Sequence, residues 1–481
     1  MRPIPSPSPS ATQPLYQHLA ERTASLIRDG VLRPGERLPS VRECCKVHGV
    51  APVTVTQAYA LLESRGLVEA RPRSGFFVRP RLGQRLAEPE MTRPVGHSTP
   101  LEVSDFIFQI LEGVKDPDVV PLGSSFPSPR LFPFERLGRC LAAAARRFAP
   151  RDTLSDLPPG NDELRRQISL RYLARGADVP PREIVITSGA MEGLNLCLQA
   201  VTRPGDLIVV ESPTFYAGLQ AAERLGLRVV EIPTHPRDGV SLAALEDVLR
   251  HHAVKACLFM LNHSNPMGSL MPAEKREELI ALLARYDLPL IEDDVYSELY
   301  FGDTPPRLSK DIDRDGRVMH VSSFSKCLAP GYRVGWVAAG RYARQVQQQK
   351  FASSIATAVP IQLALADYLR HGGYDKHLRQ LRTTLQNQEA ALAEAVERGF
   401  PADTRMARPG GGYFTWLELP PGADALRLQR EALEHGISLA PGPIFSAKRE
   451  YARHIRLNFG HPEVRFDEVI PLLGGLVAAQ C

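Results

Sequence analysis

The sequence has no run of about 18 apolar residues, the length that a helix needs to cross a bilayer, so we expect no contact with a membrane. Residues 1–10 are rich in Pro and Ser and lack an apolar stretch, unlike a secretory signal peptide. The seven cysteines show neither metal-ligand nor disulfide spacing, and Cys44 and Cys45 are adjacent. These absences favour a protein of the reducing cytoplasm.

Length and charge indicate more than one domain. The 481 residues correspond to roughly two to four domains, and 43% hydrophobic residues suffice for a large core. Residues 1–80 contain eleven Lys and Arg against six Asp and Glu, a net charge of +5, whereas the whole chain carries +4. This pattern favours a small basic module on a near-neutral body, with a chance surface bias as the alternative.

The first 80 residues predict a helix, a short helix, a turn, a third helix and a hairpin. Ser40 and Glu43 have capping-box spacing at the start of the short helix, and Pro52 suits the first turn of the third. The expected elements span residues 15–29, 41–48, 52–65, 67–70 and 76–78. This order is the plan of a winged helix-turn-helix.

These residues resemble the GntR-type winged helix over nearly all of 12–79. The matching motifs are Pro14-Leu15-Tyr16, Gly30-x-Leu32-x-Pro34-Gly35, Leu38-Pro39-Ser40-x-Arg42-Glu43, Thr54-Val55-x-x-Ala58-Tyr59-x-x-Leu62-Glu63-x-x-Gly66-Leu67 and Ser74-Gly75-Phe76-x-Val78. The resemblance implies that a domain over 12–80 binds double-stranded DNA, with the third helix in the major groove. The candidate DNA-binding residues are Ser40, Arg42, Thr54, Arg71, Arg73 and Gly75.

The start of the third helix departs from this family. The family usually has Ser or Thr and Arg there, whereas this chain has Ala51-Pro52-Val53, so few base-reading side chains remain. Arg71 and Arg73 would reach phosphates, which makes binding depend on salt. A winged domain that only packs on a partner domain is the alternative.

Residues 81–104 are rich in Pro, Arg, Glu and Thr without periodicity, and we expect a flexible linker there. From 105 to 481, apolar helices alternate with short β-rich runs. The expected strands are 184–187, 207–211, 228–232, 256–261, 289–292, 318–322 and 334–338. Strands separated by helices predict an α/β fold, with a mostly parallel sheet covered on both faces.

Polar and aromatic motifs follow these strands, at the carboxyl ends where parallel sheets bind ligands. Ser188-Gly189-Ala190-Met191 opens a helix and would offer backbone N–H groups to an anion. Phe215 would stack on a flat ring, and Asn265 could donate to a phenolate oxygen. Each motif alone has an ordinary structural explanation, as a turn or a core aromatic residue.

An acidic cluster and a lysine complete the series. Asp293, in Glu292-Asp293-Asp294, would keep a nearby pyridinium nitrogen protonated, and metal binding by these acids is a rival that no neighbouring His supports. Lys326 lies among small hydroxyl residues in Ser322-Ser323-Phe324-Ser325-Lys326, and Arg333 follows seven positions later. This pattern is typical of a Schiff-base lysine beside a phosphate site, although an exposed lysine is the simpler explanation of the segment alone.

In this order the motifs resemble fold-type I pyridoxal-phosphate enzymes of the aspartate-aminotransferase family, over about 105–480, with a small C-terminal α+β part. The resemblance implies the cofactor pyridoxal 5'-phosphate (PLP) and makes Lys326 the catalytic residue that forms the internal aldimine. The cofactor-binding residues that it implies are Gly189, Ala190, Met191, Phe215, Asn265, Asp293, Tyr296, Ser323, Ser325, Lys326 and Arg333. Arg456 matches the arginine that binds a substrate carboxylate, and no metal is implied.

A GntR-type winged helix followed by such a body resembles the MocR/GabR group of transcriptional regulators over the full length. The resemblance implies a cytoplasmic homodimer that binds DNA and senses a small amino acid or amine through aldimine exchange at Lys326. An active aminotransferase with a fused DNA-binding domain is the alternative, and a body used only for dimerisation is a third possibility.

Overall fold

The computed structural model describes residues 14–481 except 29–30, 33–35, 66, 72–74, 79–85, 95, 97, 100, 113–117, 150–156 and 372. The chain forms two compact units, Met1–Arg85 and Leu86–Cys481. Over the described ranges, every helix is either too short or too polar to span a bilayer.

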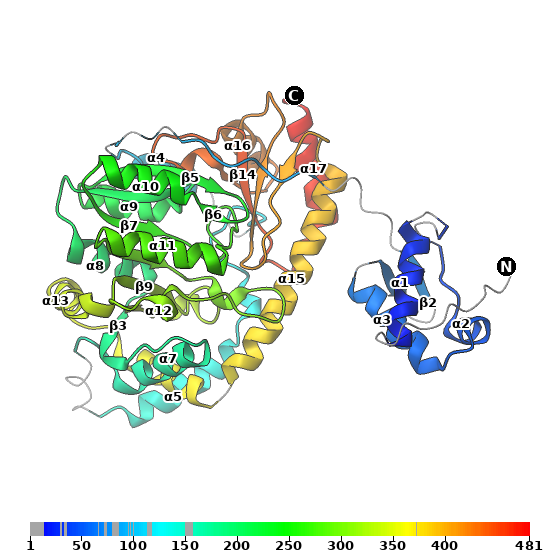
Figure 1. Ribbon diagram of the computed structural model, residues 1–481, viewed down its shortest axis with the longest axis horizontal. Coiled ribbons are helices and arrows are strands. Elements are labelled where there is room, and N and C mark those ends of the chain that lie inside the picture. Colours follow the sequence, from blue (N-terminus) through cyan, green and yellow to red (C-terminus); the bar gives the residue numbers. More distant parts are fainter. Residues whose placement is uncertain are drawn as a thin grey trace. The chain divides into compact units, whose positions relative to one another are not determined.

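The smaller unit is a winged helix-turn-helix, as predicted (Figure 1). Its elements are α1 (Leu15–Arg28), α2 (Val41–His48), α3 (Pro52–Ser64) and the antiparallel strands β1 (Val68–Arg71) and β2 (Gly75–Val78). The predicted capping box begins α2: the Ser40 hydroxyl accepts a hydrogen bond from the Glu43 N–H (3.3 Å), and the Glu43 carboxylate accepts one from the Ser40 N–H (2.9 Å). Apolar side chains of all three helices and the hairpin form one core.

The larger unit is built on an eight-stranded sheet in the order β3-β10-β9-β8-β7-β4-β5-β6. The strands are β3 (Ile184–Thr187), β4 (Leu207–Ser212), β5 (Arg228–His235), β6 (Gly239–Val240), β7 (Val254–Phe259), β8 (Leu290–Asp293), β9 (Val318–Ser323) and β10 (Gly335–Ala338). All seven predicted strands are present. The central strands are parallel, whereas β10 runs antiparallel to both of its neighbours.

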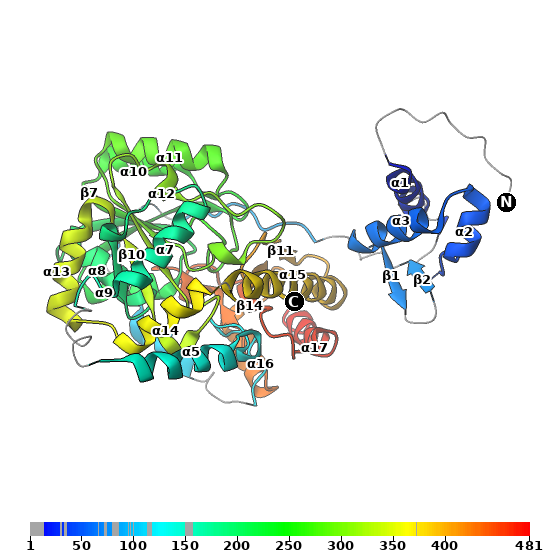
Figure 2. The same cartoon turned by 90° about the horizontal axis from the view of Figure 1, so that it is seen from below.

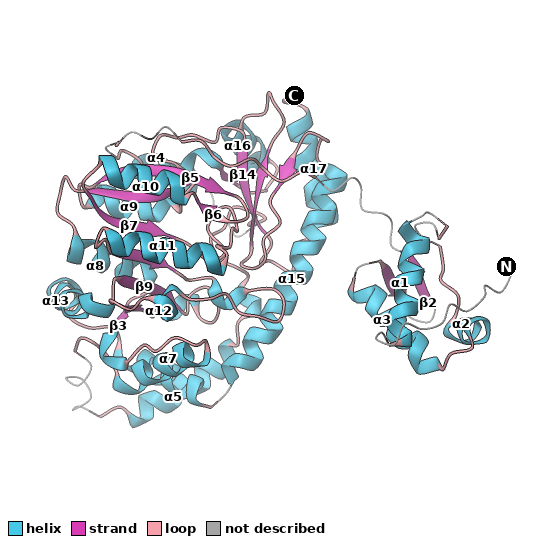
Figure 3. Ribbon diagram, in the orientation of Figure 1, coloured by secondary structure: helices cyan, strands magenta, loops and turns pink. Residues whose placement is uncertain are grey.

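Helices cover both faces of this sheet because its strands are apolar on both faces (Figure 3). In β4, Ile208 and Val210 pack in one cluster with Leu194, whereas Val209 packs in another with Leu245. The helices around the sheet are α4 (Ser104–Glu112), α5 (Phe134–Arg147), α7 (Asp162–Ala174), α8 (Ala190–Val201), α9 (Tyr216–Arg224), α10 (Leu242–His251), α11 (Ala273–Arg285), α12 (Ser309–Ile312), α13 (Ala343–Ser354) and α14 (Val359–Arg370).

A smaller antiparallel sheet forms the C-terminal part, in the order β11-β12-β14-β13. Its strands are β11 (Arg405–Met406), β12 (Phe414–Glu418), β13 (Ala440–Pro441) and β14 (His454–Asn458), and its helices are α15 (Gly373–Gly399), α16 (Ala425–Glu434) and α17 (Phe466–Ala478). Figures 1 and 2 show α17 beside the long helix α15. This arrangement agrees with the expected small C-terminal α+β part.

The prediction of a flexible linker over 81–104 is wrong for the described residues from 86 onward, which belong to the larger unit. We call the segment 86–103 the strap. Thr92 is buried, and its hydroxyl donates to the backbone oxygen of Ser212 (2.6 Å). Thr99 pairs with Val229 of β5. Local periodicity is missing because the strap is held by separate contacts to distant residues, and 81–85 lie outside the described residues.

The beginning of the strap contacts the C-terminal sheet. The backbone oxygen of Ala87 accepts a hydrogen bond from the N–H of Met406 (2.8 Å). Glu90 forms an ion pair with Arg405 (2.9 Å). The strap is therefore attached to β11 at its start and to β5 farther along.

Candidate functional site

Lys326 follows β9, and its Nζ donates to the backbone oxygen of Ser125 (2.7 Å). The same nitrogen lies 3.7 Å from the centre of the Phe126 ring. Desolvation lowers the pKa of Lys326 to about 7 and the positive charge of Arg456 adds to this effect, whereas Asp293 opposes it. An amine with such a pKa is partly neutral near pH 7 and can act as a nucleophile or a base.

Asp293 ends β8 and is 3% exposed. Its Oδ1 has no hydrogen-bond partner in the part of the chain that the structure describes. Burial raises the pKa of Asp293 to about 7, the charge of Asp294 adds to the rise, and Lys326 opposes it. A buried acceptor without a donor is suited to a ligand that brings a positively charged N–H.

Arg456 and Asn265 lie together in the buried interior. Arg456 Nη1 donates to Asn265 Oδ1 (2.9 Å), and Nη2 donates to the Gly123 backbone oxygen (2.7 Å). The Asn265 amide Nδ2 is buried and lacks an acceptor among the described residues. Tyr296 is also buried, edge-on against Tyr413 with 5.4 Å between ring centres, and burial raises its pKa. The site thus offers one amide donor and one phenol to a ligand.

The predicted phosphate residues form a cradle at the start of α8. Gly189 is the N-cap, with φ +90°, and a Cβ there would lie 2.6 Å from Arg333 Nη2. Arg333 Nη1 donates to the Ser325 hydroxyl (3.2 Å), and the Ser323 hydroxyl accepts from the Ser325 N–H (3.3 Å). A helix N-terminus, two hydroxyl groups and a guanidinium therefore share one place, where a dianion would be stabilised.

The other predicted residues lie at the starts of α8 and α9. Ala190 and Met191 form the first turn of α8, and Phe215 is the N-cap residue of α9. Ala190 and Phe215 pack against the same two core clusters.

A buried chain of hydrogen bonds next to Asp293 was not found from the sequence. Trp336 Nε1 lies 2.9 Å from the Tyr172 hydroxyl, which lies 2.7 Å from His320 Nδ1, and His320 Nε2 lies 2.8 Å from Asp294 Oδ2. An indole N–H can only donate, so the Tyr172 proton is directed to Nδ1 and the Nε2 proton of His320 to Asp294. Burial alone would raise the pKa of Asp294, but its bond with His320 holds the pKa below the usual value.

The acidic cluster has three different environments. Glu292 pairs with Arg276 at 2.7 Å, and both side chains are fully buried. Asp294 is bound by His320, whereas Asp293 Oδ1 and Glu292 Oε2 have no hydrogen-bond partner among the described residues. Asp293 is the residue that ends β8, and Glu292 is already paired with Arg276 through its other oxygen. In the described part of the chain, no group of three or more His, Cys, Asp and Glu is arranged for a metal ion.

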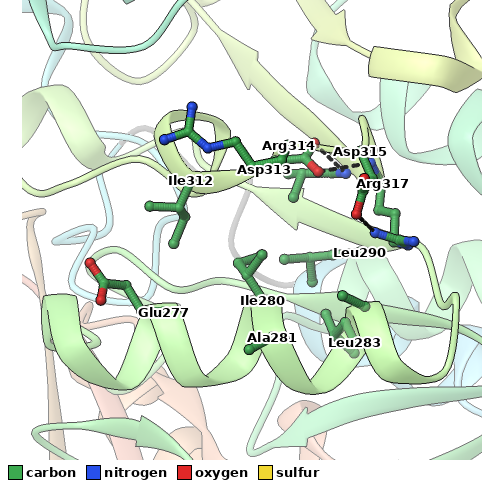
Figure 4. Close-up of a pocket in the computed structure, with 12 residues that line it drawn as sticks. Glu277, Ile280, Ala281, Leu283, Leu290, Ile312, Asp313, Arg314, Asp315 and Arg317 are labelled. Atoms are coloured by element: carbon green, nitrogen blue, oxygen red, sulfur yellow. Dashed lines mark hydrogen bonds and ion pairs between the residues drawn. The ribbon is translucent and has the colours of Figure 1, made fainter.

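A separate pocket lies between α11 and the segment after α12 (Figure 4). Ile280 and Leu283 line it from the helix. At its rim, Asp315 pairs with Arg317, and Asp313 accepts a hydrogen bond from the Arg317 N–H (2.9 Å). None of the predicted site residues lies there, so the strand ends remain the candidate site.

The winged helix presents several of the predicted DNA-binding residues. Ser40 and Thr54 are half-buried, and Arg42 is exposed. Gly75 has φ +100°, and the guanidinium of Arg37 lies 3.2 Å from the position of a Cβ there. Sequence reasoning missed Arg37, because only the fold brings it beside the hairpin. Arg73 and the side chain of Arg71 lie outside the described residues.

Comparisons with known proteins agree with both units. The family "Aminotransferase class I and II" matches residues 134–472, and "Bacterial regulatory proteins, gntR family" matches 15–78. The Escherichia coli K12 protein described as "Uncharacterized HTH-type transcriptional regulator YdcR" is 46% identical over 443 residues, which cover 92% of this chain and 94% of that protein. The E. coli regulator YjiR is 38% identical, over 93% of this chain and 95% of its own length.

Solved aminotransferases resemble the larger unit. The multiple substrate aminotransferase of Thermococcus profundus has a TM-score of 0.72 and 28% identity, over 79% of this chain and 96% of its own. LysN, the α-aminoadipate aminotransferase of Thermus thermophilus solved with N-(5'-phosphopyridoxyl)-L-leucine, has a TM-score of 0.70 and 27% identity, over 79% and 99%. The chain therefore belongs to the MocR-like family of HTH-type transcriptional regulators, in which a GntR winged helix is fused to a class I and II aminotransferase domain.

Proposed function

We propose that this protein is a PLP-dependent transcriptional regulator whose larger unit senses an amino acid or amine through exchange at Lys326. One observation carries the proposal. Asp293 Oδ1 and Asn265 Nδ2 are buried without partners among the described residues, although each unmade hydrogen bond costs about 1–3 kcal/mol. One is an acceptor and the other a donor, which matches the ring nitrogen and the ring oxygen of PLP.

The residues present fit this cofactor. Asp293, Asn265 and Tyr296 would hold the ring, the cradle at Gly189 would hold the phosphate, and Lys326 would hold the aldehyde carbon. When bound, PLP supplies an electrophilic carbon for amines and a ring that accepts electrons. The related LysN was solved with a phosphopyridoxyl amino acid, which supports this assignment.

Arg456 favours an effector with an α-carboxylate. The guanidinium is buried, 4.1 Å from the centre of the Phe414 ring and 5.3 Å from that of Phe445, so water is largely excluded from it. Its Nε has no partner among the described residues. A planar carboxylate would receive a charge-assisted pair of hydrogen bonds there.

The effector would compete with the loop 123–126 for Arg456, and its amine would take the place of the Lys326 amine on the cofactor. Lys326 donates to Ser125, and Arg456 donates to the backbone oxygens of Gly123 and Ser124. An amino acid whose carboxylate binds Arg456 and whose amine displaces Lys326 would change both of these contacts with the loop. Such a differential contact is what a ligand needs to shift the unit between two conformations, and hence to alter DNA occupancy.

An active aminotransferase is the second candidate. The lowered pKa of Lys326 and the buried Arg456 suit catalysis as well as sensing. The aromatic-amino-acid aminotransferase 1 of Thermococcus litoralis is 31% identical over 76% of this chain. A homodimer in the cytoplasm belongs to both candidates, and light scattering of the purified protein would test the dimer.

Absorbance of the PLP-loaded protein tests the proposal. We expect a visible band that changes when single amino acids or amines are added, with little turnover when 2-oxo acids are supplied. Borohydride treatment and peptide mapping should place the adduct on Lys326, and a Lys326→Ala variant should lack it. Many turnovers per minute would instead favour the enzyme. No adduct at all would refute both.

A further inference from the structure

Over the first turns of α3 the outer face consists of the exposed residues Pro52, Val53, Thr56, Gln57 and Ala60, and the exposed Glu63 and Ser64 follow at its end. They recur at helical spacing, opposite the buried Val55, Ala58, Tyr59 and Leu62. Val53 is 66% exposed, so its apolar side chain is accessible to a partner. This helix is the one that a winged helix-turn-helix places in the major groove.

From Pro52 to Ala60 the outer face carries no charged side chain, whereas Glu63 at its end accepts a hydrogen bond from the Ala70 N–H (3.0 Å). Lysine or arginine bound to guanine is the commonest specific base contact, and none is present on this face. The Thr56 hydroxyl donates its proton to the backbone oxygen of Pro52 (3.0 Å), so this proton is not available to a base. The face therefore offers the apolar atoms of Val53 and the amide of Gln57.

Basic residues lie on the neighbouring elements. Arg42 and Lys46 are exposed on α2, which packs on α3 within one core, and Arg37 lies beside Gly75 at the hairpin. Such residues suit phosphates on either side of a groove. A neutral helix face between basic neighbours is complementary to the base edges rather than to the DNA backbone.

We propose that the outer face of α3 reads A·T base pairs in the major groove: Val53 packs on a thymine C5 methyl group, and the Gln57 amide bonds the N6/N7 edge of an adenine. An apolar contact fits the methyl group, and the amide fits the donor and acceptor pattern of adenine. This inference rests on the proposed DNA binding and names the class of sequence that is bound.

The test uses the full-length, PLP-loaded protein. A duplex is first selected from a randomised pool, and each thymine is then replaced singly by deoxyuridine, which lacks only the methyl group. One replacement should weaken binding about fourfold, the equivalent of one lost buried methyl group. Val53→Ala should bind the thymine and deoxyuridine duplexes equally. Val47→Ala, at a valine 63% exposed on α2, should keep the difference.

Gln57 is tested with the same duplex. Changing one A·T pair to G·C should weaken the wild-type protein about tenfold, and Gln57→Ala should lose this discrimination. If no thymine replacement matters, or if Val53→Ala keeps the wild-type sensitivity, the inference is wrong. Binding without any selected sequence would also overturn it, while DNA binding itself would stand. No binding even at low salt would refute the proposed function instead.

Discussion

Gly189→Ala should separate cofactor binding from stability. The backbone of Gly189, at φ +90° and ψ 171°, lies in a region open essentially to glycine, so alanine costs about 1–3 kcal/mol of unfolding free energy. The new Cβ would also lie 2.6 Å from Arg333 Nη2, and the guanidinium must move away from Ser325. Loss of one hydrogen bond to a charged group, about 1.5–3 kcal/mol, corresponds to a roughly ten- to hundredfold weaker PLP affinity.

The measurement is a PLP titration of the cofactor-free protein, together with urea unfolding. Gly205→Ala is the matched control, since Gly205 has φ +89° and open space where the Cβ would be. Both variants should lose stability, but only Gly189→Ala should lose affinity. Equal PLP affinities in the two variants would show that Arg333 does not bind the phosphate.

Three further outcomes follow from buried groups. Glu292→Ala leaves Arg276 charged without its buried partner and should cost about 3–5 kcal/mol in urea unfolding. The pKa of Lys326 is about 7 in the folded protein, below its ordinary value of 10.5, so the unfolded chain binds more protons than the folded chain between these two pH values. The stability of the cofactor-free protein should therefore rise as the pH increases from about 7 to 10.5. The rise should be smaller in Lys326→Met, which lacks the titrating amine. Tyr172→Phe leaves the buried Trp336 N–H without its acceptor and should cost about 1–3 kcal/mol, measured by tryptophan fluorescence in urea.

Each of these three predictions would be contradicted by a specific result. For the first, Glu431→Ala removes the more exposed pair with Arg427 and should cost much less stability than Glu292→Ala, so equal losses would contradict the reasoning. An identical rise of stability with pH in Lys326→Met would mean that the lysine titrates normally. A Tyr172→Phe variant as stable as the wild type would show that the indole finds another acceptor.

Much of the fold was predictable, and candidate site residues could be chosen from the sequence, because the signals for both are local. Apolar runs marked the strands, and Asp293 and Lys326 lie directly at or after strand ends, where a parallel sheet gathers its ligand-binding residues. Contacts between distant segments left no such signal. Tyr172 lies 148 residues from His320, and their bond follows only from the packing of α7 against the sheet. The strap was wrongly predicted as a flexible linker for the same reason, since its contacts are with residues far away in the sequence.

The attachments of the strap have a mechanical consequence. Ala87 is bonded to Met406 in one sheet and Thr99 to Val229 in the other, with residue 86 immediately before them. Any sliding of the two sheets against each other would pull on the strap, because the strap is bonded to both of them. A shift inside the larger unit would thereby be passed to residue 86, from which the covalent chain continues toward the winged helix-turn-helix.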